Sequence, residues 1–177
     1  IQFLDAMNSK YLICSGVAQG DGIERYERAA QTFNKVGERC RQAGITFCYH
    51  NHAWEFEDLD GVKGIHRLCQ LTDPQLVKLC IDVYWVHIGG EDPAEFIQRY
   101  ADRAGYYHFK DGGPAEEPGA RPRFVELGRG TVDLPSAKDA ALAAGADWII
   151  CEQDRTELDP SDSIRISRAY ITERLGL

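Results

Sequence analysis

The sequence lacks an excess of positive charge. It has 20 Lys and Arg residues against 28 Asp and Glu residues, which gives a formal net charge of −8 at pH 7. A protein that binds the phosphate backbone of nucleic acid needs a basic surface. The charge balance therefore argues against nucleic acid as a partner.

Long apolar stretches are also missing. No segment approaches the roughly 20 apolar residues that a membrane-spanning helix needs, so we expect no membrane partner. Hydrophobic residues still make up 44% of the chain, which is enough for a folded core and too much for a disordered protein. The length of 177 residues is usual for one domain, so we expect a single domain over residues 1–177.

None of the six cysteines belongs to a Cys-x-x-Cys pair, which argues against zinc-ribbon and thioredoxin-like folds. The cysteines are Cys14, Cys40, Cys48, Cys69, Cys80 and Cys151. Four of them lie within apolar runs, and we interpret them as small buried hydrophobic residues rather than disulfide partners. We therefore expect a reducing, cytoplasmic location. A signal peptide lost before Ile1 is the alternative, because the chain does not begin with Met.

What the chain does contain is an alternation of strands and helices. Apolar runs predict strands at residues 10–16, 45–52, 76–85, 104–111, 123–128 and 147–154. Helical periodicity and capping residues predict helices at residues 21–44, 61–71, 92–100, 135–144 and 163–175, with Asp21 and Asp92 as N-caps and a loop at 112–123. This order is typical of an α/β fold with a parallel sheet covered by helices. An open doubly wound sheet fits the length, whereas a complete (β/α)8 barrel usually needs about 250 residues.

Polar side chains gather at the ends of the predicted strands, which is where α/β proteins bind ligands. They are His50, Asn51, His52 and Glu55; Asp82; His108, Lys110 and Asp111; Glu126 and Arg129; Glu152 and Asp154. An Asp, a His and a Glu from three strands can converge on one divalent ion such as Mn²⁺, Zn²⁺, Co²⁺ or Fe²⁺. The alternative is that these polar residues only line solvated loops at the edge of the sheet. Their recurrence at successive strand ends favours a ligand-binding site.

Five motifs together resemble a known family. They are Tyr-His-Asn-His-Ala-Trp-Glu-Phe (49–56), Ile-Asp-Val-Tyr-Trp (81–85), His-Phe-Lys-Asp (108–111), Glu-Leu-Gly-Arg-Gly-Thr-Val-Asp (126–133) and Cys-Glu-Gln-Asp (151–154). In this order they resemble the xylose-isomerase-like TIM-barrel family, which includes sugar phosphate isomerases/epimerases, inosose dehydratase and endonuclease IV. The resemblance runs from Lys10 to the end of the chain. It implies a partial (β/α)8 TIM barrel that matches strands 3–8, with the two N-terminal βα units missing.

The resemblance also implies one divalent metal ion, with Asp82, His108 and Glu152 as ligands. Epimerases of the family place a Glu at the end of strand four, where this chain has its His-Asn-His cluster. We expect His50 as the fourth ligand, with Glu55 as the rival. Mn²⁺ is the first expectation for the metal, and Zn²⁺, Co²⁺ and Mg²⁺ are alternatives. The additional ligands of the three-metal endonuclease branch are not evident in the chain.

The activity implied is that of a metal-dependent sugar or sugar phosphate isomerase or epimerase, which moves a proton next to a carbonyl. Glu152 is the expected base, and His50, His52 or Glu55 would serve the opposite face of the substrate. Lys110 would hold a hydroxyl or stabilise enediolate charge; its alternative is an ion pair with Asp111 at the rim.

The sequence also suggests how a substrate would be held. Trp54 and Trp85 would stack on a sugar or cyclitol, and Arg129 would meet a phosphate. A homo-oligomer remains open. Two other functions also remain open: a lyase of the inosose dehydratase or keto-sugar type, and an inactive barrel fragment.

Overall fold

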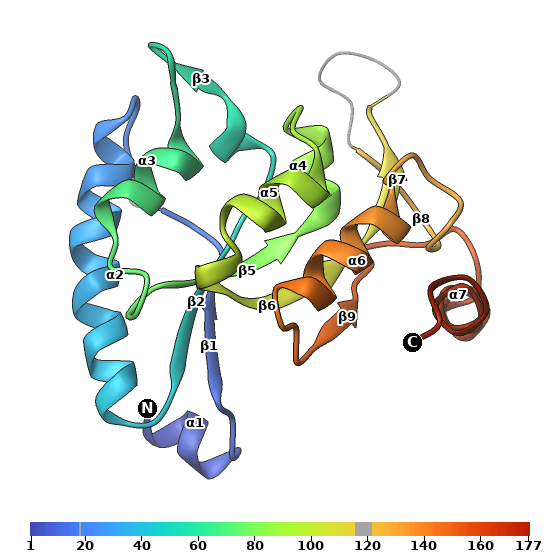
Figure 1. The fold of residues 1–177 in the computed structure, drawn as a ribbon, viewed down its shortest axis with the longest axis horizontal. Helices are drawn as coiled ribbons and strands as arrows, with labels where there is room; N and C mark the ends of the chain where they lie inside the picture. Colours follow the sequence, from blue (N-terminus) through green and yellow to red (C-terminus); the bar gives the residue numbers. More distant parts are fainter. Residues whose placement is uncertain (18, 116–121) are drawn as a thin grey trace.

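The computed structural model describes residues 1–17, 19–115 and 122–177. Five parallel strands form one sheet, and their order in the sheet follows their order in the chain (Figure 1). They are β1 (Tyr11–Cys14), β2 (Thr46–His50), β5 (Lys78–Asp82), β6 (Ala104–Phe109) and β9 (Ile149–Cys151). Each neighbouring pair is parallel. This is the sheet of a partial TIM-like barrel, so the predicted α/β fold class is confirmed.

Helices separate the strands of this sheet. The longer ones are α2 (Glu24–Gln42), α3 (Gly64–Leu71), α5 (Pro93–Arg99), α6 (Leu134–Ala143) and α7 (Pro160–Tyr170). Shorter elements are α1 (Gln2–Ala6), α4 (Val83–Ile88), the one-turn helices η1 (Trp54–Phe56) and η2 (Ala101–Arg103), and the π-helix η3 (Ile171–Leu175). No helix in the described part of the chain is long and apolar enough to cross a bilayer.

Helix α2 shows how the sequence pattern builds the core. Its apolar positions recur every three or four residues, and the residues at these positions are buried against the sheet. Phe33 packs against Phe47 and Tyr49 of β2, with ring centroids 5.4 Å away in both cases, and Figure 1 shows α2 alongside β2. The helix ends before Gly44, which has the φ of +70° that favours glycine. The predicted cap at Asp21 is wrong, because the helix begins after Ile23 and has no side-chain cap.

The cysteine interpretation is largely confirmed. All six cysteines are free, and four of them are buried: Cys40, Cys48, Cys69 and Cys80. Cys14 is half-buried and Cys151 is exposed. Burial raises the pKa of the Cys48 thiol to about 12, so at neutral pH this residue behaves as a small apolar side chain.

Two predicted strands differ from the structure. The strand predicted over 76–85 ends at Asp82, because the Asp82 carboxylate accepts the backbone N–H groups of Tyr84 and Trp85 and caps α4. The strand predicted over 123–128 is not part of the parallel sheet. Its residues Arg123–Val125 form β8, which pairs antiparallel with β7 (Asp111–Gly113). Glu126 and Arg129 therefore follow a hairpin rather than a strand of the barrel.

Asp111, the first residue of β7, binds the loop that follows the β7–β8 hairpin. The carboxylate of Asp111 accepts backbone N–H groups from the loop after β8, which are those of Gly128, Gly130 and Val132, at 2.9 to 3.2 Å. These bonds hold the loop against β7. A second small hairpin, β3 (Asp58–Leu59) with β4 (Val62–Lys63), was not predicted. Of the loop predicted at 112–123, residues 116–121 lie outside the described residues.

Candidate metal centre

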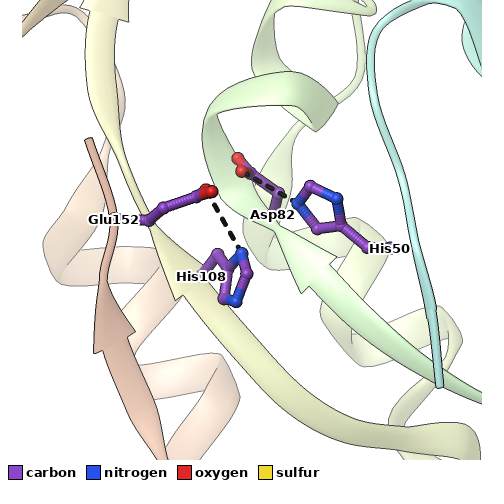
Figure 2. A group of neighbouring side chains, drawn as sticks. All are labelled: His50, Asp82, His108 and Glu152. Atoms are coloured by element: carbon purple, nitrogen blue, oxygen red, sulfur yellow. Dashed lines mark hydrogen bonds and ion pairs between the residues drawn. The ribbon is translucent and has the colours of Figure 1, made fainter. Parts of the chain in front are cut away.

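The carboxyl ends of four sheet strands bring His50, Asp82, His108 and Glu152 together, and Figure 2 shows their side chains facing one another. One ligand atom of each lies within 4.8 Å of the ligand atoms of the other three. Asp82 and His108 are direct partners in the register between β5 and β6. The other two come from the end of β2 and from the residue after β9. The sequence named these four residues as the expected ligand set, with His50 in the uncertain fourth place.

The donor set fits a divalent cation. Two imidazoles and two carboxylates are ligands that Mn²⁺, Zn²⁺, Co²⁺ and Fe²⁺ accept. His108 Nδ1 lies 3.2 Å from Glu152 Oε2, and Lys110 Nζ lies 2.9 Å from the same oxygen. The imidazole nitrogen and the carboxylate oxygen therefore face each other within the cluster, as two ligands of one ion would.

Lys110 lies beside this cluster and is 1% exposed. Its Nζ is 3.3 Å from Asp82 Oδ2, 2.9 Å from Glu152 Oε2 and 2.9 Å from Asp154 Oδ2. Burial alone would lower the pKa of this ammonium, but the three carboxylates outweigh burial and raise the pKa. With all groups ionised, three carboxylates and one ammonium leave two negative charges, which a divalent ion would balance. The alternative pairing with Asp111 is not seen, since the Asp111 carboxylate accepts backbone N–H groups.

The two carboxylates of the cluster have different environments. Burial raises the pKa of Asp82, although His50 and Lys110 act in the opposite direction. Burial would also raise the pKa of Glu152, but His108 and Lys110 outweigh it, so that the pKa of Glu152 is strongly lowered. Glu152 is therefore ionised at neutral pH and is the more accessible of the two, with its side chain 30% exposed against 0% for Asp82.

Asn51 holds the end of β5 in place. Its side-chain amide donates to Asp82 O at 3.2 Å, and its amide oxygen accepts Asp82 N–H at 3.0 Å. The sequence placed Asn51 at the strand end without assigning it a role. The signal was its place between two histidines, but the reciprocal pair of hydrogen bonds depends on the spacing between β2 and β5.

A group of aromatic side chains lies next to the cluster, and we call His52, Trp54, Trp85 and Phe124 the aromatic wall. The His52 ring stacks on Trp54 with centroids 3.9 Å apart and lies 5.6 Å from Trp85. Phe124 lies 5.7 Å from Trp85. Lys110 Nζ lies 5.1 Å from the Trp85 centroid and 5.3 Å from that of Phe124, so the wall reaches the charged centre. Phe124 has no signal in the sequence, because its position depends on the β7–β8 hairpin.

His52 and Trp85 carry unused polar atoms. Within the described residues, His52 Nδ1 and Trp85 Nε1 are buried without a hydrogen-bond partner. Burial, together with electrostatic repulsion from His50 and Lys110, lowers the pKa of His52 to about 4. At neutral pH the ring is therefore uncharged and able to stack on the adjacent indole.

Two residues expected in the site are not members of the four-residue cluster. Glu55 is fully buried and accepts hydrogen bonds from the Tyr49 hydroxyl and the His52 backbone, and it is not in the four-residue cluster. Arg129 is an exposed ion-pair partner of Glu126 at 3.6 Å. It lines a pocket of about 220 Å³ with Thr131, and none of the four cluster residues lines that pocket.

The family model of the xylose isomerase-like TIM barrel matches residues 1–174. The chain belongs to this family. It is 29% identical over 207 aligned residues to an inosose dehydratase of Lacticaseibacillus casei, an alignment that covers 99% of this chain and 68% of that protein. The predicted resemblance is thereby confirmed, including its inosose dehydratase branch.

Solved structures show the same fold. A sugar phosphate isomerase/epimerase from Parabacteroides distasonis ATCC 8503 aligns with a TM-score of 0.82 at 22% identity, covering 96% of this chain and 61% of that one. A structure of an IOLI protein with a bound zinc atom aligns with a TM-score of 0.77 at 15% identity, covering 99% of this chain and 66% of that one. The chain thus spans about two thirds or less of these solved structures.

Proposed function

We propose that this chain carries the active site of a divalent-metal-dependent dehydratase that acts on an inosose or a similar cyclic polyhydroxy ketone. The observation that carries the proposal is the convergence of His50, Asp82, His108 and Glu152 within 4.8 Å. The inosose dehydratase from L. casei supplies the substrate class. That relative moves our preference from an isomerase or epimerase, expected first from the sequence, to the lyase that was its alternative.

The cluster would hold one divalent ion, with Mn²⁺ as first candidate and the zinc of the IOLI structure as a precedent for Zn²⁺. Such an ion would polarise the ketone oxygen and so acidify the neighbouring C–H group. The Glu152 carboxylate would take the proton from this carbon. The electron pair of the broken C–H bond then forms the new C=C bond and expels the hydroxyl group on the next carbon.

Lys110 supplies the matching acid. Its ammonium would give a proton to the departing hydroxyl, which leaves as water. After this step Glu152 is protonated and Lys110 is neutral. The two groups lie 2.9 Å apart, so the proton on Glu152 can return to Lys110 and restore both for the next turnover. The pair thus accounts for the proton removed and the proton donated, without a net change in the protein.

The aromatic wall would bind the ring of the substrate. The flat faces of Trp54 and Trp85 suit the C–H face of a cyclitol, and the unpartnered His52 Nδ1 and Trp85 Nε1 can bond to its hydroxyls. An inosose carries no phosphate, so the proposal that Arg129 meets a phosphate belongs only to the alternative of a sugar phosphate substrate. The absence of a nucleic-acid partner, proposed from the charge balance, agrees with this small polar substrate.

The test is an assay in D₂O. The chain is stripped with a chelator, loaded with Mn²⁺, Co²⁺ or Zn²⁺, and incubated with an inosose while ¹H NMR follows the substrate. We expect a dehydrated product in the metal-loaded sample alone. Glu152→Gln should lower kcat by at least about 1,000-fold, because it removes the proton acceptor. Glu157→Gln, an exposed neighbour, serves as the matched control.

An isomerase or epimerase is the second candidate, because the isomerase/epimerase from P. distasonis has the same fold. It would show as deuterium entering a C–H position of a sugar or cyclitol ketone without loss of water. A chain that binds no divalent metal and turns over no such substrate would support the third alternative, an inactive barrel fragment.

A further inference from the structure

Glu55 is a fully buried carboxylate near the cluster of His50, Asp82, His108 and Glu152, and it is not a member of that cluster. Both of its oxygens are occupied by donors of the chain. Oε1 accepts the Tyr49 hydroxyl at 2.5 Å, and Oε2 accepts the backbone N–H of His52 at 2.8 Å. A carboxylate is costly to bury, and these two donors offset that cost. Each oxygen therefore faces a donor of the chain, and Glu55 is not one of the four converging residues.

The two donors come from different parts of the chain. Tyr49 belongs to β2, whereas His52 lies in the loop between β2 and η1. Glu55 itself lies in η1, so its carboxylate ties this loop back onto the strand that carries His50. The hydroxyl of Tyr26 lies 3.5 Å from Trp54 O and adds a weaker contact from α2. Glu55 thus fixes the course of the backbone from 51 to 55.

The His52 ring depends on this loop for its place. It lies 4.8 Å from the His50 ring on one side and stacks at 3.9 Å on Trp54 on the other. It is thus the link between the metal cluster and the aromatic wall. Moving the His52 backbone would displace His52 and Trp54 from the cluster without touching a ligand.

We propose that Glu55 is a positioning residue that holds His52 and Trp54 against the metal centre, rather than a metal ligand or an acid–base group. This inference rests on the proposed function, because the aromatic wall is assigned there to the substrate ring. It assigns to Glu55 a role that the motif alone leaves open between ligand and catalyst.

The test compares Glu55→Met, which fills the space without an acceptor, with Glu55→Gln, which keeps one acceptor oxygen. Glu57→Met is the matched control, since Glu57 is exposed two residues away. We expect kcat/KM to fall about 100-fold in Glu55→Met, mostly through KM, and about 10-fold in Glu55→Gln. The control should stay within about twofold of the parent chain.

Three further readouts separate positioning from direct catalysis. The visible spectrum and affinity of bound Co²⁺ should be unchanged in Glu55→Met, whereas a changed spectrum would make Glu55 a ligand. In a background that carries both His52→Ala and Trp54→Ala, Glu55→Met should cost less than about twofold more; a full additional loss would mean that Glu55 acts on the substrate itself. The His52 backbone amide, followed by NMR, should exchange with D₂O at least about tenfold faster in Glu55→Met. Unchanged exchange would overturn the proposal. This readout needs no turnover, so it still decides the role of Glu55 if the parent chain proves inactive and the proposed function fails.

Discussion

Lys110 Nζ lies 2.9 Å from Glu152 Oε2 in a centre where the lysine is almost completely buried. A buried ammonium is costly unless carboxylates surround it. Two of these carboxylates, Asp82 and Glu152, are also expected ligands of a divalent cation, so the lysine and the ion would share their negative charge. We therefore propose that Lys110 contributes to both the stability and the chemistry of the site.

The first prediction concerns that shared charge. Lys110→Met leaves Asp82, Glu152 and Asp154 without their cation, and breaking a buried ion pair by removing one partner costs roughly 3–5 kcal/mol. Urea unfolding in the presence of chelator should show this loss, and saturating Mn²⁺ should recover part of it. The exposed Lys35→Met is the control and should change stability by less than about 0.5 kcal/mol. Equal stability of the two variants would mean that the carboxylates are not ionised together.

The second prediction concerns Glu91, away from the metal centre. Lys63 Nζ and His66 Nε2 both lie 2.8 Å from Glu91 Oε1. Burial alone would raise the pKa of Glu91, but these two partners outweigh it and lower the pKa. A carboxyl with a lowered folded pKa stabilises the protein above its unfolded pKa, and this contribution is lost as the pH falls through the folded pKa.

Glu91→Gln should therefore lower the free energy of unfolding by about 1 kcal/mol at pH 7, and the difference from the parent chain should shrink in acid. Urea unfolding at a series of pH values from 7 down to 3.5 measures it. Exposed Glu95→Gln provides the comparison at matched charge. A Glu91→Gln effect that is constant over this pH range would show that the loss is one of packing rather than of charge.

The third prediction concerns the loop after β8. A Cβ atom on Gly130 would lie 2.1 Å from Asp111 Oδ1 and 2.4 Å from the Gly112 backbone nitrogen. Gly130→Ala should therefore destabilise the chain by about 1–3 kcal/mol, because the loop has to move away from the Asp111 carboxylate. Gly113→Ala, which meets no atom within 4 Å, should be tolerated. Thermal unfolding measures the stability of both variants. If Gly130→Ala is as stable as Gly113→Ala, the Asp111 contacts are dispensable.

Much of the fold could be predicted, because the alternation of strands and helices and the order of the motifs both indicate an α/β barrel. The convergence of His50, Asp82, His108 and Glu152 could also be predicted, since the carboxyl ends of parallel strands meet at one edge of a sheet. The end of β5 could not, because Asp82 serves as strand end and helix cap at once, and an apolar run continues through Val83–Trp85. This pattern predicts a longer strand, because α4 is apolar as well.

The loop residues were harder still. Phe124 reaches Lys110 through a hairpin whose pairing is set by backbone hydrogen bonds to Asp111, which have no local sequence signature. The partners of Glu55 depend on how the backbone turns between Asn51 and Phe56. A motif read along the chain gives the residue types of such a loop but not the direction in which a carboxylate points.

The most direct test of the account is calorimetric titration of the chelator-treated chain with Mn²⁺. We expect one bound ion per chain, with the same stoichiometry in His87→Asn, whose histidine lies outside the cluster. Asp82→Asn and His108→Ala should each weaken binding by at least about 100-fold, since each removes one of four ligands. Two results would contradict the assignment of this centre. One is that the parent chain binds no Mn²⁺, and the other is that Asp82→Asn and His108→Ala bind it as tightly as the parent chain does.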